Sequence, residues 1–135
     1  AVVAAANERQ LSLAEVQNFR VSPGGGVEAM FSGTPVLIGS PRFIAERGLD
    51  LAAFAEKTAA LEAEGQTVVA VVRNATIAGL IAIADEIRPE ARAVIAELKE
   101  LGVETVMITG DNERTAAAIA AKAGIDRYYA GVKPE

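Results

Sequence analysis

The sequence predicts an α/β chain built from two unlike units, and three observations carry this prediction. In residues 1–84, short apolar runs alternate with turns rich in glycine and proline, which is typical of antiparallel α+β structure. From residue 85 onward, helical and extended patterns alternate, which predicts a parallel, doubly wound sheet. No repeat and no linker separates the two patterns, so we place the domain boundary at Ala84-Asp85, giving units 1–84 and 85–135.

The composition of the 135-residue chain excludes several classes of chemistry. It contains no Cys and no His, so a disulfide, a thiolate metal site and a Ser-His-Asp triad cannot form within it. A metal site could use only oxygen ligands, which suit Mg²⁺ or Ca²⁺. The net charge is −5 and both units are mildly acidic, which argues against nucleic-acid binding. The apolar runs are far shorter than the roughly 20 residues of a membrane span, so we expect a soluble, cytosolic segment.

Local start and stop signals place the elements of the first unit. The apolar alternation around Pro23-Gly24-Gly25-Gly26 predicts two strands joined by a glycine-rich turn. Ser40 and Pro41 are typical of an N-cap and a first helical residue, and Gly65 is typical of a helix stop. In order, we expect a helix over 1–9, two strands within 16–31, a strand over 36–39, a helix from 41 that Gly48 ends, a helix over 51–64, and a hairpin of strands 67–72 and 77–84.

The second unit has the same kinds of helix start and stop signals. Pro89 is typical of a first helical residue, and Gly102 and Gly124 are typical of helix ends. We expect a helix over 89–101, a short buried strand over 103–108, a helix over 112–123 and a strand over 128–130.

The clearest candidate for chemistry is Thr109-Gly110-Asp111, which follows the short strand and runs into a helix at Asn112. Ligands of open α/β sheets bind outside the carboxyl ends of the strands, and helix N-termini favour anions. Thr109 offers a hydroxyl, Gly110 lets a ligand approach the backbone, and Asp111 could approach a bound Mg²⁺. The alternative is a turn followed by an ordinary helix cap.

Two weaker candidates lie upstream. Asp85 and Arg88 also stand between a strand and a helix, where Arg88 could pair with a phosphate or with Asp85. The alternative is an ordinary helix start, which acidic residues favour. Gly24-Gly25-Gly26-Val27 and Gly39-Ser40 lie at strand ends where a flat ring could lie against the backbone, although glycine in a turn needs no function.

Taken in order, these motifs resemble heavy-metal-transporting P-type ATPases over essentially the whole chain. The stretches that carry the resemblance are Ile83 through Ala91, Ala96 through Val103, Met107 through Asn112 with Thr115-Ala116 and Ile119-Ala120, Gly124-Ile125-Asp126, Tyr129-Ala130 and Lys133-Pro134-Glu135. Upstream, the glycine segments and Gly65-Gln66-Thr67-Val68-Val69 also resemble that family.

The resemblance implies a nucleotide-binding domain over 1–84, with its N-terminal part missing, and part of a haloacid-dehalogenase-like, Rossmann-type phosphorylation domain over 85–135. It implies ATP and Mg²⁺ as cofactors and, as partners, the membrane and actuator domains of a pump, with this segment on the cytoplasmic side of the membrane. Its nucleotide-contacting residues would be Gly24, Gly26, Val27, Gly39 and Ser40, where many relatives have Asn in place of Ser40. Thr109, Gly110 and Asp111 would face the phosphates or Mg²⁺, and Asp85 and Arg88 would match a hinge motif.

Departures from the family pattern predict an inactive piece of a metal pump. The phosphorylated Asp-Lys-Thr-Gly-Thr segment, the Gly-Asp-Gly-x-Asn-Asp segment and the adenine-contacting His-Pro pair do not occur in the sequence. We therefore expect at most weak nucleotide binding and, in the second unit, an apolar sheet edge that is either exposed or paired with another molecule. The sequence around Gly39 and Asp85 resembles that of zinc, cadmium or lead exporters more than that of copper exporters. The alternatives are a stand-alone phosphatase of the haloacid-dehalogenase type, whose nucleophilic Asp lacks a counterpart here, and a noncatalytic interaction module.

Overall fold

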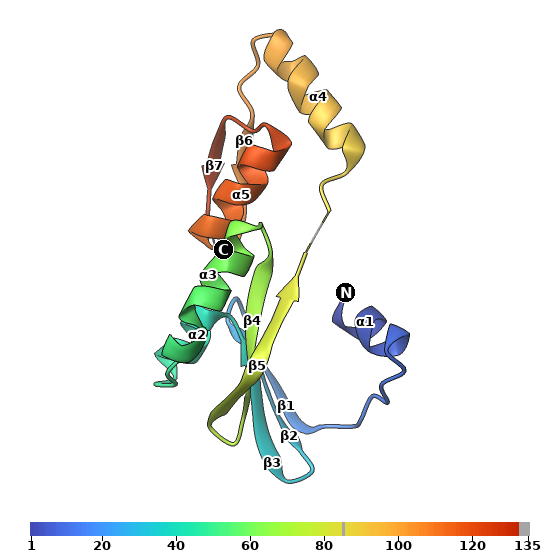
Figure 1. The fold of residues 1–135 in the computed structure, drawn as a ribbon, viewed down its shortest axis with the longest axis vertical. Helices are drawn as coiled ribbons and strands as arrows, with labels where there is room; N and C mark the ends of the chain where they lie inside the picture. Colours follow the sequence, from blue (N-terminus) through green and yellow to red (C-terminus); the bar gives the residue numbers. More distant parts are fainter. Residues whose placement is uncertain (85, 133–135) are drawn as a thin grey trace. The chain divides into compact units, whose positions relative to one another are not determined.

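The computed structural model describes residues 1–84 and 86–132, and they form two compact units (Figure 1). The first unit consists of Ala1–Ala55 with Val68–Ile83, and the second of Glu56–Thr67 with Ala84–Glu135. The chain passes from one unit to the other at Ile83/Ala84 and also contributes residues 56–67, which precede the hairpin, to the second unit. Asp85, on which part of the hinge prediction falls, lies outside the described residues.

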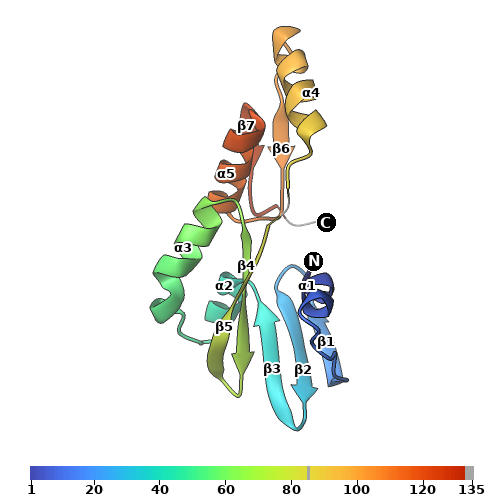
Figure 2. The same ribbon diagram turned by 45° about the vertical axis from the view of Figure 1, so that its right-hand side comes forward.

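The first unit is built on a five-stranded sheet in the order β1-β2-β3-β4-β5, which Figure 2 shows side by side. Neighbours β1/β2, β2/β3 and β3/β4 are antiparallel, which confirms the expected class for this part of the chain. The strands are β1 (Gln17–Ser22), β2 (Gly26–Phe31), β3 (Thr34–Gly39), β4 (Thr67–Arg73) and β5 (Thr76–Ile83).

One short helix closes the core of this unit. Helix α2 (Pro41–Glu46) begins where the sequence predicts, and the Ser40 hydroxyl accepts a hydrogen bond from the Phe43 amide at 3.2 Å. Phe43 and Ile44 are buried with Ala70 and Val72 of the sheet. Burying side chains of this size contributes about 1.5–3 kcal/mol each, so α2 anchors one end of the sheet. By contrast, the predicted N-terminal helix, α1 (Val2–Glu8), has no buried residue.

The helix predicted over 51–64 is divided at its start. A 3₁₀ turn, η1 (Ala52–Phe54), precedes helix α3 (Ala55–Ala63). The Asp50 carboxylate accepts a hydrogen bond from the Ala52 amide at 2.7 Å, and the Phe54 amide donates to the Leu51 carbonyl at 2.9 Å. These two bonds tighten the first turn to three residues, which apolar spacing alone does not reveal.

The second unit contains α3 and the predicted alternation of helices and strands. It comprises α4 (Pro89–Glu100), β6 (Val106–Ile108), α5 (Glu113–Ala123) and β7 (Arg127–Tyr129). Strands β6 and β7 are parallel, with Met107 opposite Tyr128, which confirms the parallel character of this part. Helix α5 buries Thr115, Ala116, Ala120 and Ala123, a face of small side chains that permits close packing. None of the helices within 1–84 and 86–132 combines the length and apolar character needed to cross a bilayer.

The central strand of this unit differs from its prediction in length and burial. We expected a buried strand from Val103, but β6 begins at Val106. The Val103 amide donates to the Leu98 carbonyl, closing the end of α4, and the Thr105 amide donates to Asp126 Oδ2. Val106 is 47% exposed and Ile108 is 68% exposed, because in the described residues β7 is the one strand beside β6.

Candidate functional site

The glycine segments that the sequence singles out lie together at one end of the β2–β3 pair. Gly26 stands opposite Gly39 and Val27 opposite Ile38 in the antiparallel register. The Ser40 amide donates to the Gly25 carbonyl at 3.0 Å, which joins the two segments beyond the last strand pair. The structure thus places Gly24, Gly26, Val27, Gly39 and Ser40 in one neighbourhood of the first unit.

Three positions in these segments must be glycine for packing reasons, independently of any ligand. At Gly25 and Gly39 the atom nearest an ideal Cβ belongs to the Phe43 ring, Cδ2 at 2.4 Å and Cδ1 at 2.5 Å. At Gly26 the nearest atom is the Ile38 carbonyl oxygen at 2.2 Å, and Phe43 Cδ1 lies at 2.9 Å. Gly24 differs, because its φ of +69° is in the left-handed region and no atom lies within 4 Å of its ideal Cβ. The structure therefore explains Gly25, Gly26 and Gly39 by close packing, and of these four glycines Gly24 alone borders open space.

An arginine covers another side of the Phe43 ring. The Arg47 guanidinium carbon lies 4.6 Å from the ring centroid, and its guanidinium also forms an ion pair with Glu28 of β2. A cavity of about 540 Å³ adjoins this pair and is lined by Arg20, Leu37 and Leu49 among others. Sequence reasoning missed Phe43 and Arg47 as parts of this region, because a helical Phe-x-x-x-Arg spacing carries no specific signal.

The Thr109-Gly110-Asp111 loop stands at the end of β6, as predicted, and hydrogen bonds fix its shape. The Thr109 hydroxyl donates to Asp111 Oδ2 at 2.8 Å, and the Asp111 amide donates back to the Thr109 oxygen at 3.1 Å. Backbone bonds fasten the loop to the segment after β7: the Gly131 amide donates to the Asp111 carbonyl at 2.7 Å and the Val132 amide to the Thr109 carbonyl at 3.0 Å. Gly110 remains exposed, so its backbone is open to a ligand.

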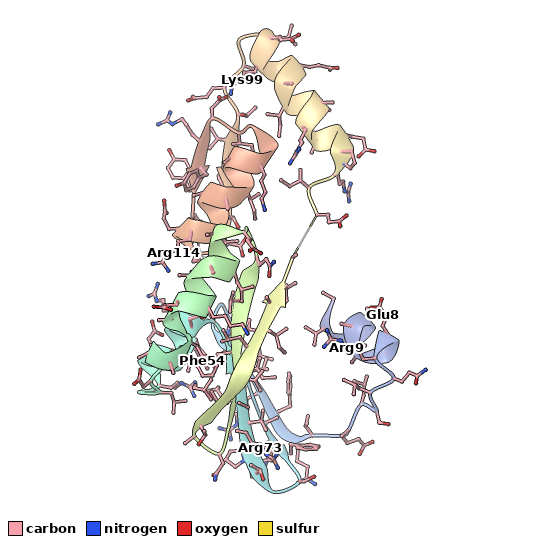
Figure 3. The ribbon with its side chains drawn as sticks, in the orientation of Figure 1. Glu8, Arg9, Phe54, Arg73, Lys99 and Arg114 are labelled. Atoms are coloured by element: carbon pink, nitrogen blue, oxygen red, sulfur yellow. The ribbon has the colours of Figure 1, made fainter. Side chains whose placement is uncertain are left out.

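The end of α3 and the start of β4 also contact this loop and the residues that follow it. The Thr67 hydroxyl donates to Asp111 Oδ1 at 2.9 Å, so both carboxylate oxygens of Asp111 accept hydrogen bonds from hydroxyls. The buried Glu62 carboxylate accepts from Asn112 Nδ2 at 2.9 Å and from Arg114 Nη1 at 3.3 Å. Figure 3 labels Arg114 at the start of α5, beside α3.

Asn112 caps helix α5 through its side-chain oxygen. Asn112 Oδ1 accepts from the Arg114 amide at 3.0 Å and from the Thr115 amide at 3.1 Å. Its amide nitrogen meanwhile donates to Glu62, so one side chain serves both the helix cap and the contact with α3. Two of the amide groups that could face an anion at this helix start are therefore already hydrogen-bonded within the protein.

The residues that the structure describes do not by themselves form a magnesium site. Within 1–84 and 86–132, no group of three acidic side chains lies close enough to hold a metal ion. Asp111 is a single carboxylate, and both of its oxygens are engaged by Thr67 and Thr109. Mg²⁺ prefers octahedral coordination by one or two carboxylates with several waters and phosphate oxygens, so other ligands would have to complete such a site.

Arg88, the described half of the hinge motif, precedes helix α4. Its φ of −56° and ψ of 133° make it the residue before the first helical turn, and its carbonyl accepts from the Ala91 amide at 3.0 Å. The side chain is exposed. The predicted pairing of Arg88 with Asp85 lies outside the described residues.

Asp126 lies directly before β7 and joins this end of the small β6–β7 sheet to helix α4. It forms an ion pair with Lys99 of α4, labelled in Figure 3, and accepts from the Thr105 hydroxyl at 3.2 Å. The hydrogen bond from Lys99 and the one from the Thr105 amide lower the pKa of the Asp126 carboxyl below its usual value. This cluster fastens α4 to the chain entering β7 and is structural.

Comparison with known proteins places the whole chain in one family. Residues 1–135 match the profile of haloacid dehalogenase-like hydrolases. The chain is 44% identical, over its full length, to the copper-transporting P-type ATPase of Rhizobium leguminosarum bv. viciae, and it spans 16% of that protein. It is 40% identical to a zinc-transporting PIB-type ATPase of known structure in its E2.Pi state, with a TM-score of 0.65 over 99% of this chain and 21% of the other.

A smaller structure is also similar. The N-domain of HMA8, a copper-transporting P-type ATPase, is 30% identical with a TM-score of 0.51, over 62% of this chain and 72% of that domain. The relatives thus include both copper and zinc transporters, and the chain covers about a fifth or less of the full-length ones. The match over all 135 residues shows that the chain belongs to the haloacid dehalogenase-like hydrolase family, and it is similar throughout to a segment of copper- and zinc-transporting P-type ATPases.

Proposed function

We propose that this chain carries the nucleotide-contacting residues and part of the phosphate-side machinery of a heavy-metal-transporting P-type ATPase. In such a pump, ATP hydrolysis through an aspartyl-phosphate drives metal across the membrane. The observation that carries the proposal is the Thr109-Gly110-Asp111 loop, which is hydrogen-bonded into a fixed shape at the carboxyl end of β6 and runs into the capped helix α5. It occurs in a chain whose full length is similar to such ATPases.

In this proposal, residues 1–84 are a nucleotide-binding domain. Gly24, Gly26, Val27, Gly39 and Ser40 contact the adenine and ribose. Two observations support this role: the two segments meet at Gly26 and Gly39, and Gly24 combines a left-handed backbone with open space beside it. At Gly24, backbone without a side chain would let a flat ring lie close.

Residues 85–135 are part of a phosphorylation domain, with Asp85 and Arg88 at a hinge on the cytoplasmic side of the pump. The exposed backbone at Gly110 would meet a phosphate oxygen, and Thr109 and Asp111 keep that backbone in place. ATP is handled as its Mg²⁺ complex, in which the metal bridges phosphate oxygens. Because the described residues do not form a metal site, we assign no metal-dependent step to this chain.

Calorimetric titration tests whether the chain recognises a nucleotide or only an anion. We expect Mg²⁺ with a nonhydrolysable ATP analogue to bind in the millimolar range, and inorganic phosphate under the same conditions to bind more weakly. Equal affinities for the two ligands would contradict the adenine and ribose contacts. The chain alone should not hydrolyse a generic phosphoester, and turnover that survives Asp111→Asn would instead support a stand-alone phosphatase.

A further inference from the structure

We propose that Thr67 is a positioning residue for Asp111, holding its carboxylate as a hydrogen-bond acceptor and so withholding it from divalent cations. The inference rests on the proposed function only in treating the Thr109–Asp111 loop as a phosphate-side motif. Thr67 is the first residue of β4 and stands 44 positions before Asp111, so the contact joins segments that are distant in sequence.

The two oxygens of the Asp111 carboxylate accept hydrogen bonds from two different hydroxyl groups. Oδ1 accepts from Thr67 at 2.9 Å and Oδ2 accepts from Thr109 at 2.8 Å. A hydroxyl that donates to a carboxylate points its hydrogen at the oxygen, which is the opposite of what a cation requires there. Each carboxylate oxygen has two lone-pair sites, so a divalent ion at Oδ1 would share that oxygen with the Thr67 hydroxyl, whose hydrogen bond weakens the attraction of the oxygen for the ion.

The segment that carries Thr67 is itself anchored on helix α5, so Thr67 is held in place. The Thr115 hydroxyl, fully buried, donates to the Gln66 carbonyl at 3.0 Å. Lys122 donates to the Glu64 carbonyl, and Glu62 accepts from Asn112 and Arg114. These bonds fasten residues 62–67 along α5, which leaves the Thr67 hydroxyl at a fixed distance from Asp111.

The four hydrogen bonds that fasten residues 62–67 to α5 involve backbone atoms of some residues and side-chain atoms of others. Gln66 and Glu64 contribute only backbone carbonyls to them, so substituting their side chains leaves these bonds intact. Thr67 contributes its side-chain hydroxyl, which a substitution removes without disturbing the backbone. Thr67→Val is nearly the same shape and lacks the donor, whereas Thr67→Ser keeps the donor.

The test uses Mn²⁺ as the probe and paramagnetic broadening of backbone amide signals as the readout, with no nucleotide present. In the wild-type chain, the amides of Gly110, Asp111 and Asn112 should broaden no more than those around Asp50, an exposed carboxylate that accepts a backbone amide. In Thr67→Val, we expect Mn²⁺ to bind at Asp111 about fivefold more tightly, the factor that one ordinary hydrogen bond controls. Thr67→Ser should behave as wild type.

Thr76→Val is the matched control, because Thr76 is an exposed first residue of the neighbouring strand β5. It should leave the Mn²⁺ response at Asp111 unchanged. Strong wild-type broadening centred on Asp111, or a native spectrum of Thr67→Val with unchanged Mn²⁺ affinity, would overturn the proposal. Where Thr67→Val does not fold, strong wild-type broadening centred on Asp111 still overturns the proposal. Because nucleotide is absent, a failure here leaves the calorimetric test of nucleotide binding independent.

Discussion

The ring of Phe43 lies against the backbone of Gly39, at a distance that leaves no room for a side chain on the glycine. An ideal Cβ at Gly39 would stand 2.5 Å from ring atom Cδ1 and 2.9 Å from the Gly25 carbonyl oxygen. The same ring excludes a side chain at Gly25, and the Ile38 carbonyl oxygen, 2.2 Å from an ideal Cβ, excludes one at Gly26. Close packing thus requires glycine at Gly26 and Gly39, two of the positions that the sequence associates with nucleotide binding, and at Gly25, which lies between Gly24 and Gly26.

Gly39→Ala should therefore destabilise the first unit by about 1–3 kcal/mol, the usual cost of overpacking a well-packed site. The free energy of unfolding in urea measures the loss. Gly79→Ala is the control, because its φ is not in the left-handed region and no atom lies within 4 Å of its ideal Cβ. Equal stability of the two variants would show that Phe43 moves aside freely.

The turn of the β4–β5 hairpin offers a stabilising substitution. Asn74 has a φ of +48° and Ala75 a φ of +59°, so both central residues are left-handed, as in a type I′ turn. Asn is tolerated there, but Ala is not the preferred residue. Ala75→Gly should raise the free energy of unfolding by about 1 kcal/mol, measured in urea, since it removes the left-handed strain. Ala75→Val should lower it, and the reverse order would contradict the turn geometry.

Glu62 is 6% exposed and is held by two side-chain donors, so its removal should be costly. Glu62→Ala leaves the Asn112 amide without its acceptor and should lower stability by about 1–3 kcal/mol. Glu64→Ala, at an exposed position two residues later, should change stability by less than about 0.5 kcal/mol. Thermal unfolding of the two variants under identical conditions makes the comparison. A Glu62→Ala protein as stable as Glu64→Ala would show that the contact between α3 and α5 contributes nothing.

Asp126 should make the second unit sensitive to acid. Its pKa is lower in the folded chain than the usual value of 3.8, chiefly because Lys99 and the Thr105 amide donate to its carboxylate. A depressed folded-state pKa stabilises the fold fully above pH 3.8, and this contribution disappears as the pH falls below that value through the folded-state pKa. Melting temperatures of wild type and Asp126→Asn should thus differ at pH 6 and converge toward pH 2. A difference that stays constant over this range would contradict the assignment.

The elements of the fold are predictable from the sequence because their signals are local. Ser40 and Pro41 mark the start of helix α2, and Gly124, with a φ of +78°, marks the end of helix α5. The β6–β7 pairing follows from the alternation of helices and strands. The prediction that the strand ending at Ile108 is buried is wrong, because burial depends on how many strands flank β6 rather than on the apolar character of its residues. The exposed apolar sheet edge expected in the second unit is found at Val106 and Ile108.

The contacts around the candidate sites were not predictable, since they join residues far apart in the chain. Thr67 belongs to a β-branched run and indicates only a strand, yet it bonds to Asp111, 44 positions later. Glu62 has the spacing of an ordinary surface residue on a helix, yet it is buried against Asn112, 50 positions later. Positions such as Phe43 acquire their role only when the sheet brings Gly26 opposite Gly39.

The central claim, that the glycine segments of the first unit contact a nucleotide, is tested most directly by amide NMR. The labelled chain is titrated with Mg²⁺ and a nonhydrolysable ATP analogue, and in parallel with Mg²⁺ and inorganic phosphate. We predict saturable shifts at residues 24–27 and 39–40 with the nucleotide, and none there with phosphate. Native spectra that show no shift at these residues at millimolar nucleotide, or equal shifts with phosphate, would contradict the claim.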